Sequence, residues 1–479
     1  MPTILDLPDE VHRLIGEQLS SKVLYSCVRV CHSFYSVYIP CFWSDIHVKQ
    51  YKGSSIGPDQ LRANAHLVET INYSSTLTND YYTIVYPRLQ TIKMSTYVTD
   101  RKDPNYLQVQ PHQKVQFARL HPTVRKLSFD QPGSLSREFW EVVETEWNDF
   151  ESLDLSGVVL EDVVDVFWRL LEQVKKSEGL RYLKWDVTDI PFPYRMVMDA
   201  FKEGCWPELC EVDIAGPTSS DQDLAKVLRM LPSQRLKRFG RMRDELGPLT
   251  YGRLRGLYCG HLQELKIGRC TGITSSMTQE LLTECVHLAY FDAPHIFVRD
   301  IATAPKSWGC SRLEILVTFI VKQKDDEGEW EGKVFKQISK LGRLQTLDLQ
   351  RFPHPSDKTI RSSEISYLQT LDFRLSPSSN PEDIYGYGNN DNTSSNSNSN
   401  SSSSSSSGGH LSCWSSLVQL RDLIFDDDRQ TLGMEEALWM TEHWRDLRCI
   451  YGDFKGVKGD NVNKLEQLFS KKGVLHLKH

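Results

Sequence analysis

A six-residue pattern, apolar-x-x-apolar-x-apolar, recurs along most of this chain and limits its fold more than any other feature. Clear copies begin at Val68, Leu89, Val124, Phe150, Leu180, Leu209, Leu262, Leu344, Leu368 and Leu420. Weaker copies begin at Leu236, Leu288, Leu313 and Leu447. From Leu209 to Leu313 successive copies start 27, 26, 26 and 25 residues apart. Such a period is typical of a solenoid, in which each unit buries its apolar side chains against its neighbours.

The alternation inside each copy predicts a short strand, and the residues that follow predict a turn and a helix. The clearest unit runs from Leu262 to Cys285. It resembles the cysteine-containing subclass of leucine-rich repeats. We therefore expect an α/β leucine-rich-repeat solenoid, a horseshoe with parallel strands inside and helices outside, whose two ends need caps. A segment at Val474, Leu475 and Leu477 is expected to form the last strand.

Three cysteines share one position in these repeats. Cys259, Cys285 and Cys310 each stand three residues before the first leucine of a predicted strand. We expect buried structural side chains there, because a zinc site would need close pairs such as Cys-x-x-Cys. The chain has 11 cysteines, and without a signal peptide these favour reduced thiols over a disulfide framework. No metal and no cofactor is expected.

The first fifty residues predict short amphipathic helices. Apolar residues spaced by four make one stripe on the first helix, namely Leu7, Val11, Ile15 and Leu19. A second helix, ended by Pro40, is indicated by Leu24, Cys27, Val28, Cys31, Phe34 and Tyr35. Large apolar groups follow at Phe42, Trp43 and Ile46. Three helical pieces of this size form a small core and usually need a partner, which favours an interaction module.

Taken together, these N-terminal residues resemble the F-box family. The resemblance rests on Leu7-Pro8-x-Glu10, Ile15, Leu19, Leu24, Cys27, Val30-Cys31, Phe34, Trp43 and Ile46. It implies a three-helix motif that binds the Skp adaptor, which in turn sits on a cullin scaffold with a RING subunit. The implied adaptor-binding residues are Leu7, Pro8, Val11, Ile15, Leu19, Val30 and Trp43, and Trp43 would also brace the motif internally. The alternative is an ordinary helical hairpin at a domain terminus.

Composition adds few limits. The chain has 479 residues and a net charge of −7, which argues against a general nucleic-acid binder. Residues 1–10 lack a signal-peptide pattern, and the longest apolar stretch, Ile315–Val321, is too short to span a bilayer. We therefore expect a protein of the cytoplasm or nucleus that has neither nucleic acid nor membrane as a partner.

A low-complexity insertion interrupts the repeats. From Pro377 to Gly409 the chain is mainly serine, asparagine and glycine, a composition that cannot offset the entropy cost of folding. We expect a disordered loop, either a phosphorylation-controlled arm or a tolerated serine expansion. The predicted domains are thus an F-box at 1–50, repeats at 51–376, the disordered insertion at 377–409, and terminal repeats with a C-terminal cap at 410–479.

One stretch is strongly basic. Between Arg235 and Arg269 there are nine positive residues and three negative ones. If these arginines share one surface, they would bind phosphate or carboxylate groups of a phosphorylated or acidic protein target. The candidate target-binding residues are Arg235, Lys237, Arg238, Arg241, Arg243, Arg253 and Arg255. The alternative is a solvated helix face on the outside of the solenoid.

The sequence shows no glycine-rich phosphate loop, no His-Glu-x-x-His and no Gly-x-Ser-x-Gly. No catalytic residue is therefore named. The F-box resemblance implies a non-catalytic subunit of a Skp–cullin–F-box ubiquitin ligase, which binds a protein target through the repeats and promotes its ubiquitination. Two alternatives remain: a scaffold that binds the Skp adaptor without a cullin, and an enzyme whose site is assembled from distant residues of the repeats.

Overall fold

The structure of the protein is a computed structural model. It describes the chain apart from residues 1–3, 5–6, 49–55, 74–78, 95–110, 130–132, 160–163, 188–189, 216–219, 243–244, 322–329, 350–410, 425–432, 453, 455–456, 458–459 and 478–479. Its contacts divide the chain into two compact units, Met1–Leu236 and Lys237–His479. The two are described in turn as the first unit and the second unit.

The first unit begins with three helices, α1 (Asp9–Glu17), α2 (Ser21–Cys27) and α3 (His32–Ser44). The helix predicted from Leu24 onward is thus divided in two. Cys31 caps α3, because its Sγ accepts the Phe34 N–H at 3.5 Å. Pro40 lies inside α3 rather than ending it. A proline removes one helical hydrogen bond, and we attribute its tolerance here to the burial of Tyr38 and Trp43 on the same helix.

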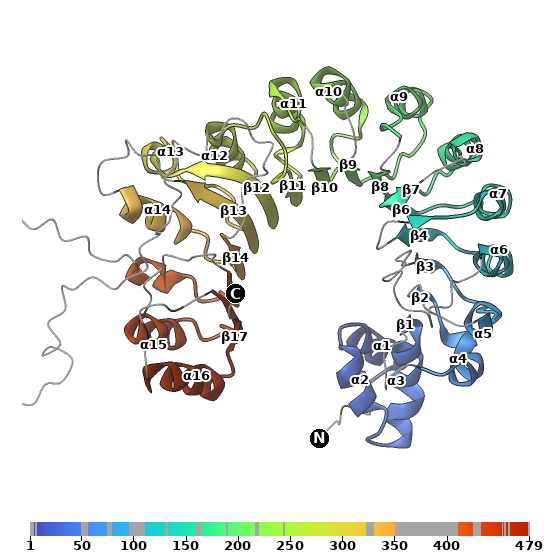
Figure 1. Ribbon diagram of the computed structural model, residues 1–479, viewed down its shortest axis with the longest axis horizontal. Helices are drawn as coiled ribbons and strands as arrows, with labels where there is room; N and C mark the ends of the chain where they lie inside the picture. The colour runs from blue at the N-terminus through green and yellow to red at the C-terminus, as the bar shows by residue number, and fades with distance from the viewer. Residues whose placement is uncertain are drawn as a thin grey trace, which may run out of the picture. The chain divides into compact units, whose positions relative to one another are not determined.

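The strands of the first unit pair in parallel in chain order. They are β1 (Asp45–Val48), β2 (Thr70–Tyr73), β3 (Thr91–Met94), β4 (Lys126–Phe129), β6 (Ser152–Ser156), β8 (Tyr182–Asp186) and β9 (Glu211–Ala215). Between them run α4 (Pro58–Asn64), η2 (Ala65–Leu67), α5 (Asn79–Tyr82), α6 (Pro111–Leu120), α7 (Arg137–Glu146), α8 (Val164–Lys175) and α9 (Tyr194–Lys202), and α10 (Asp221–Met230) follows β9. A separate small pair joins β5 (Gly133–Ser134) to β7 (Val158–Val159). Strands line one side of this unit and helices the other (Figure 1).

The second unit repeats the same arrangement. Its strands are β10 (Arg238–Met242), β11 (Glu264–Lys266), β12 (Tyr290–Phe297), β13 (Ile315–Val321), β14 (Thr346–Asp348), β15 (Asp422–Ile424), β16 (Cys449–Tyr451) and β17 (Leu475–Leu477), again parallel in chain order. Its helices are α11 (Pro248–Tyr258), α12 (Ser275–Glu284), α13 (Val298–Thr303), α14 (Trp330–Ile338), η4 (Leu411–Ser416), α15 (Met434–His443) and α16 (Asp460–Lys472). Both units are therefore built from strand–turn–helix repeats, as the sequence pattern predicts.

The apolar pattern locates the strands closely. Each strand from β10 to β13 begins two residues after the first apolar position of its copy, as β11 does after Leu262. Leu265 pairs in register with Phe239 on one side and Phe291 on the other, and all three side chains are fully buried. This ladder of buried residues is the core of the second unit, because each repeat covers the apolar side chains of the next.

One predicted copy does not fit this ladder. Leu368 lies outside the described residues, and β14 pairs directly with β15, with Leu347 opposite Leu423. The copies that start at Leu344 and Leu420 are therefore consecutive in the sheet. In the described sheet no strand stands between β14 and β15, so the strand pairing contradicts the prediction of a repeat at Leu368 between these two copies. The predicted insertion at 377–409 lies outside the described residues as well.

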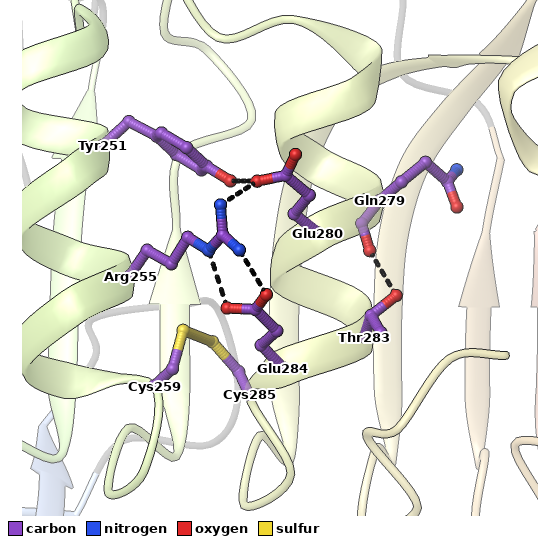
Figure 2. The surroundings of a disulfide bond; sticks show 8 residues. All are labelled: Tyr251, Arg255, Cys259, Gln279, Glu280, Thr283, Glu284 and Cys285. Atoms are coloured by element: carbon purple, nitrogen blue, oxygen red, sulfur yellow. Dashed lines mark hydrogen bonds and ion pairs between the residues drawn. A yellow bond between two sulfur atoms is a disulfide. The ribbon is translucent and has the colours of Figure 1, made fainter. Parts of the chain in front are cut away.

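The cysteines at the shared repeat position are buried, as predicted: Cys259 is 7% exposed, and Cys285 and Cys310 are 0% exposed. Cys259 and Cys285 are joined by a disulfide bond (Figure 2). This differs from the expectation of reduced thiols. Equivalent positions of adjacent parallel repeats lie about one strand spacing apart, and here the two Cα atoms are 4.2 Å apart.

Candidate functional site

Large apolar side chains are exposed in unusual number on the N-terminal helices. We define the N-terminal apolar surface as Ile4, Leu7, Val11, Leu14, Val23, Tyr25, Val30 and Tyr35. These are 8 of the 17 large apolar residues exposed in the described part of the chain, although they fall within its first 35 residues. Exposed apolar side chains concentrated in this way mark an interaction surface.

The packing of α1 on α3 decides which side of α1 stays exposed. His12 and Gly16 lie one turn apart and are buried against α3. The Nδ1 atom of His12 is hydrogen-bonded to the Tyr38 hydroxyl at 3.0 Å, and the two rings meet edge to face. At 100° per residue, the opposite side of α1 carries Val11 and Leu14, and Leu7 is exposed just before the helix begins. The burial of His12 and Gly16 against α3 therefore leaves the apolar side chains of Val11 and Leu14 exposed to solvent.

The structure places the predicted adaptor-binding residues unevenly. Val30 is 66% exposed and Leu7 and Val11 are each 37% exposed, and Pro8 is exposed at the start of α1. The remaining predicted residues are less accessible: Ile15 and Leu19 are half-buried, and Trp43 is buried. Trp43 packs edge to face on Phe42 with ring centroids 5.8 Å apart, so it supports the helices from inside rather than presenting its ring to a partner.

Some exposed residues of this surface were not predicted. Leu14 is 61% exposed, and its spacing of three from Val11 places the two side chains on the same face of α1. That spacing was a sufficient signal to find it. Tyr25 is 52% exposed and lies beneath the Arg29 guanidinium, which is 5.3 Å from the ring centroid. The short α2 has no long apolar period, so the sequence gives no comparable signal for Tyr25.

Charged side chains occupy several other positions of α1. Asp9 and Glu10 are exposed in the first turn of α1, where carboxylates interact favourably with the helix dipole. Further along the helix, Arg13 and Glu17 form an exposed ion pair at 3.3 Å. Exposed apolar side chains accompanied by charged ones are usual in a protein–protein interface.

The candidate target-binding residues that the structure describes lie on different elements. Arg235 belongs to the first unit, where it donates to the Pro207 carbonyl at 2.9 Å and pairs with Glu208. In the second unit Arg238 lies on β10, whereas Arg253 and Arg255 lie on α11. Strands and helices occupy opposite sides of this unit (Figure 1). The remaining three are Lys237, which is exposed, Arg241, which is 1% exposed, and Arg243, which lies outside the described residues.

Several of these cations are paired with carboxylates. Arg238 contacts both carboxylate oxygens of Glu264, at 2.5 and 2.7 Å. Arg255 contacts Glu284 and Glu280 across the gap between α11 and α12 (Figure 2). The hydrogen bond to Glu284 raises the pKa of Arg255 and lowers the pKa of Glu284. Paired in this way, Arg238 and Arg255 are less available to the phosphate or carboxylate groups of a target.

Among the described residues, no group of three or more His, Cys, Asp or Glu side chains is arranged to hold a metal ion. Within the same residues, no helix has both the length and the apolar character needed to cross a membrane.

No protein-family model matches the chain, and no curated protein sequence matches it. Among solved structures, the chain is similar to the crystal structure of the Rad7 and Elc1 complex in yeast, with a TM-score of 0.39 and 11% sequence identity. The match covers 73% of this chain and 90% of the other.

Proposed function

We propose that this chain is a substrate-recognition subunit of a Skp–cullin–F-box ubiquitin ligase, with an F-box in its first fifty residues and leucine-rich repeats in the remainder. The observation that carries the proposal is the N-terminal apolar surface. Its eight exposed side chains are costly to leave in water, and three short helices offer too small a core to cover them. A protein partner with an apolar groove would bury these side chains.

The repeats are proposed to hold the protein target. On strands such as β8, polar side chains alternate with buried apolar ones. Tyr182 and Lys184 lie on the sheet side that faces away from the helices, while Leu183 and Trp185 of the same strand are buried. Lys184 is 3.7 Å from Asp154 on the neighbouring β6. Parallel strands at a fixed spacing thus present rows of polar groups to a bound protein.

In this role the chain carries out no bond chemistry itself. It brings a target lysine close to the ubiquitin-charged enzyme and raises the effective concentration of the two reactants. We propose the cytoplasm or nucleus as its location and the cullin and RING subunits as further partners through the adaptor.

Co-purification with the Skp adaptor tests the proposal. The full chain should retain the adaptor, and a Leu7→Ala/Val11→Ala variant should lose most of it, because both side chains belong to the N-terminal apolar surface. Leu249→Ala is the matched control, since Leu249 is 56% exposed on α11 and lies outside that surface. Equal recovery of the adaptor by all three proteins would contradict the proposal.

Recovery of the cullin separates the ligase from a scaffold. If the chain builds a ligase, the cullin and RING subunits should co-purify with the adaptor, and both should disappear in the Leu7→Ala/Val11→Ala variant. Recovery of the adaptor without the cullin would favour the scaffold instead.

A further inference from the structure

The bonded pair Cys259 and Cys285 links two neighbouring repeats at the same point of each. Cys259 follows the last residue of α11 and Cys285 the last residue of α12. Each stands three residues before the leucine that opens the next strand pattern, Leu262 and Leu288. The bond therefore ties two turns together at the positions where the chain passes from helix to strand.

Other contacts already hold these two helices together. Tyr251 donates to Glu280, and Arg255 bridges to Glu280 and Glu284, all between α11 and α12 (Figure 2). In Figure 2 these polar contacts lie along the helices, and the disulfide lies at their ends. The thiols thus stay neighbours without the bond, because the polar contacts and the sheet register keep the repeats in place.

A third cysteine provides an internal comparison. Cys310 occupies the same position in the next repeat, is completely buried and is a free thiol. Burial raises the pKa of its thiol to about 12. Since the thiolate is the reactive form, Cys310 is expected to be inert at neutral pH. Cys259, at 7% exposed, is the more accessible member of the bonded pair.

We propose that Cys259 and Cys285 form a redox-responsive cross-link between adjacent repeats, made and broken by exchange with a low-molecular-weight disulfide such as oxidised glutathione. The Cys259 thiolate attacks one sulfur of oxidised glutathione and releases one glutathione thiolate. The Cys285 thiolate then attacks the Cys259 sulfur of this mixed disulfide and releases the second. Two protein thiols lose two electrons and two protons, and one oxidised glutathione becomes two reduced glutathiones.

The cross-link has a consequence for stability. It closes a loop with a sequence separation of 26 residues and so restricts the unfolded chain. Because a solenoid transmits a change mainly to neighbouring repeats, the effect is expected to concentrate on β11 and β12. This inference does not depend on the proposed ligase function.

Thiol trapping on the full chain tests the chemistry. The protein is equilibrated at a series of reduced-to-oxidised glutathione ratios, quenched with iodoacetamide under denaturing conditions and mapped by mass spectrometry. We expect the Cys259–Cys285 cross-linked peptide to increase as the buffer becomes more oxidising, while Cys310 is alkylated as a free thiol throughout. Cys259 and Cys285 fully alkylated at every ratio, or cross-linked at every ratio, would overturn the proposal.

Thermal unfolding separates the cross-link from a packing effect. Adding reductant should lower the Tm of the oxidised wild-type protein by a few degrees. A Cys259→Ala variant should have the same Tm with and without reductant, whereas Cys310→Ala should keep the wild-type response even if its Tm is lower. A response to reductant that persists in Cys259→Ala, or that is missing from the wild type, would refute the proposal.

Discussion

Gly16 on α1 lies directly against Cys41 on α3: a Cβ atom added to Gly16 would stand 2.7 Å from the Cys41 Sγ and 3.2 Å from Tyr38. Only a glycine allows this close approach of the two helices. The Gly16→Ala substitution should therefore push α1 away from α3 and destabilise the helical module by about 1–3 kcal/mol, measured as the free energy of unfolding in urea.

A second variant checks that contact. In the double variant Gly16→Ala/Cys41→Ala the nearest sulfur is gone, so part of the lost stability should return. If Gly16→Ala is as stable as the wild type, α1 and α3 are not packed as described.

Burial of His121 makes the first unit sensitive to acid. Its Nε2 accepts the Tyr86 N–H at 3.0 Å and its Nδ1–H donates to the Phe117 carbonyl at 2.7 Å, which requires the neutral ring. Burial lowers the pKa of His121 from 6.5 to about 4. The unfolded chain therefore takes up the proton first, and stability falls as the pH drops from about 6.5 to about 4.

The loss from this group should be on the order of 3 kcal/mol across that range. Urea unfolding at several pH values measures it. His121→Gln should be less stable at neutral pH but lose less stability on acidification, while His112→Gln, an exposed position on α6, the helix that ends just before His121, should behave as the wild type. An unchanged pH dependence in His121→Gln would show that His121 does not cause it.

Arg241 and Arg253 should respond differently to charge reversal. Arg241 is 1% exposed. Reversal of a buried charge lowers the free energy of unfolding by roughly 3–5 kcal/mol, so Arg241→Glu should be less stable than the wild type in a urea titration. Arg253 is exposed on α11, and Arg253→Glu should change stability by less than about 1 kcal/mol. Equal effects of the two substitutions would mean that Arg241 is not buried in solution.

A substitution at Leu265 tests whether the ladder of buried residues stabilises the second unit. It is fully buried between Phe239 and Phe291, so Leu265→Ala should cost roughly 2–5 kcal/mol. Leu249→Ala, at a position that is 56% exposed, should cost less than about 1 kcal/mol. Hydrogen exchange should locate the damage at β10 to β12, because solenoid repeats mainly stabilise their neighbours. Loss of protection across the whole chain would contradict this local coupling.

The strand positions could be predicted because the repeat carries its own register. An apolar residue such as Leu262 marks a strand two residues later, and the same relation holds where the spacing between copies varies. β14 pairs directly with β15, although a copy of the pattern at Leu368 lies between them in the chain. A single sequence does not say which copies pair with each other.

The charge partners could not be predicted from the local sequence. Arg238 and Glu264 are 26 residues apart, and Arg255 and Glu284 are 29 apart, about one repeat in each case. The net charge of the segment from Arg235 to Arg269 does not include Glu280 and Glu284. It therefore overstates how basic the surroundings of these arginines are in the folded protein. In a solenoid, charges have to be counted across repeats as well as along the chain.

The affinity of the full chain for the Skp adaptor tests the central claim most directly. Leu14 and Val30 are 61% and 66% exposed, so Leu14→Asp and Val30→Asp should leave the fold intact, as should the control Leu249→Asp. Measured by calorimetric titration, each of the first two variants should raise the Kd at least about tenfold, which corresponds to about 1.4 kcal/mol, and the control should match the wild type. If the wild-type chain binds no adaptor, or if both aspartate variants bind as tightly as the wild type, the N-terminal apolar surface is not the adaptor-binding site.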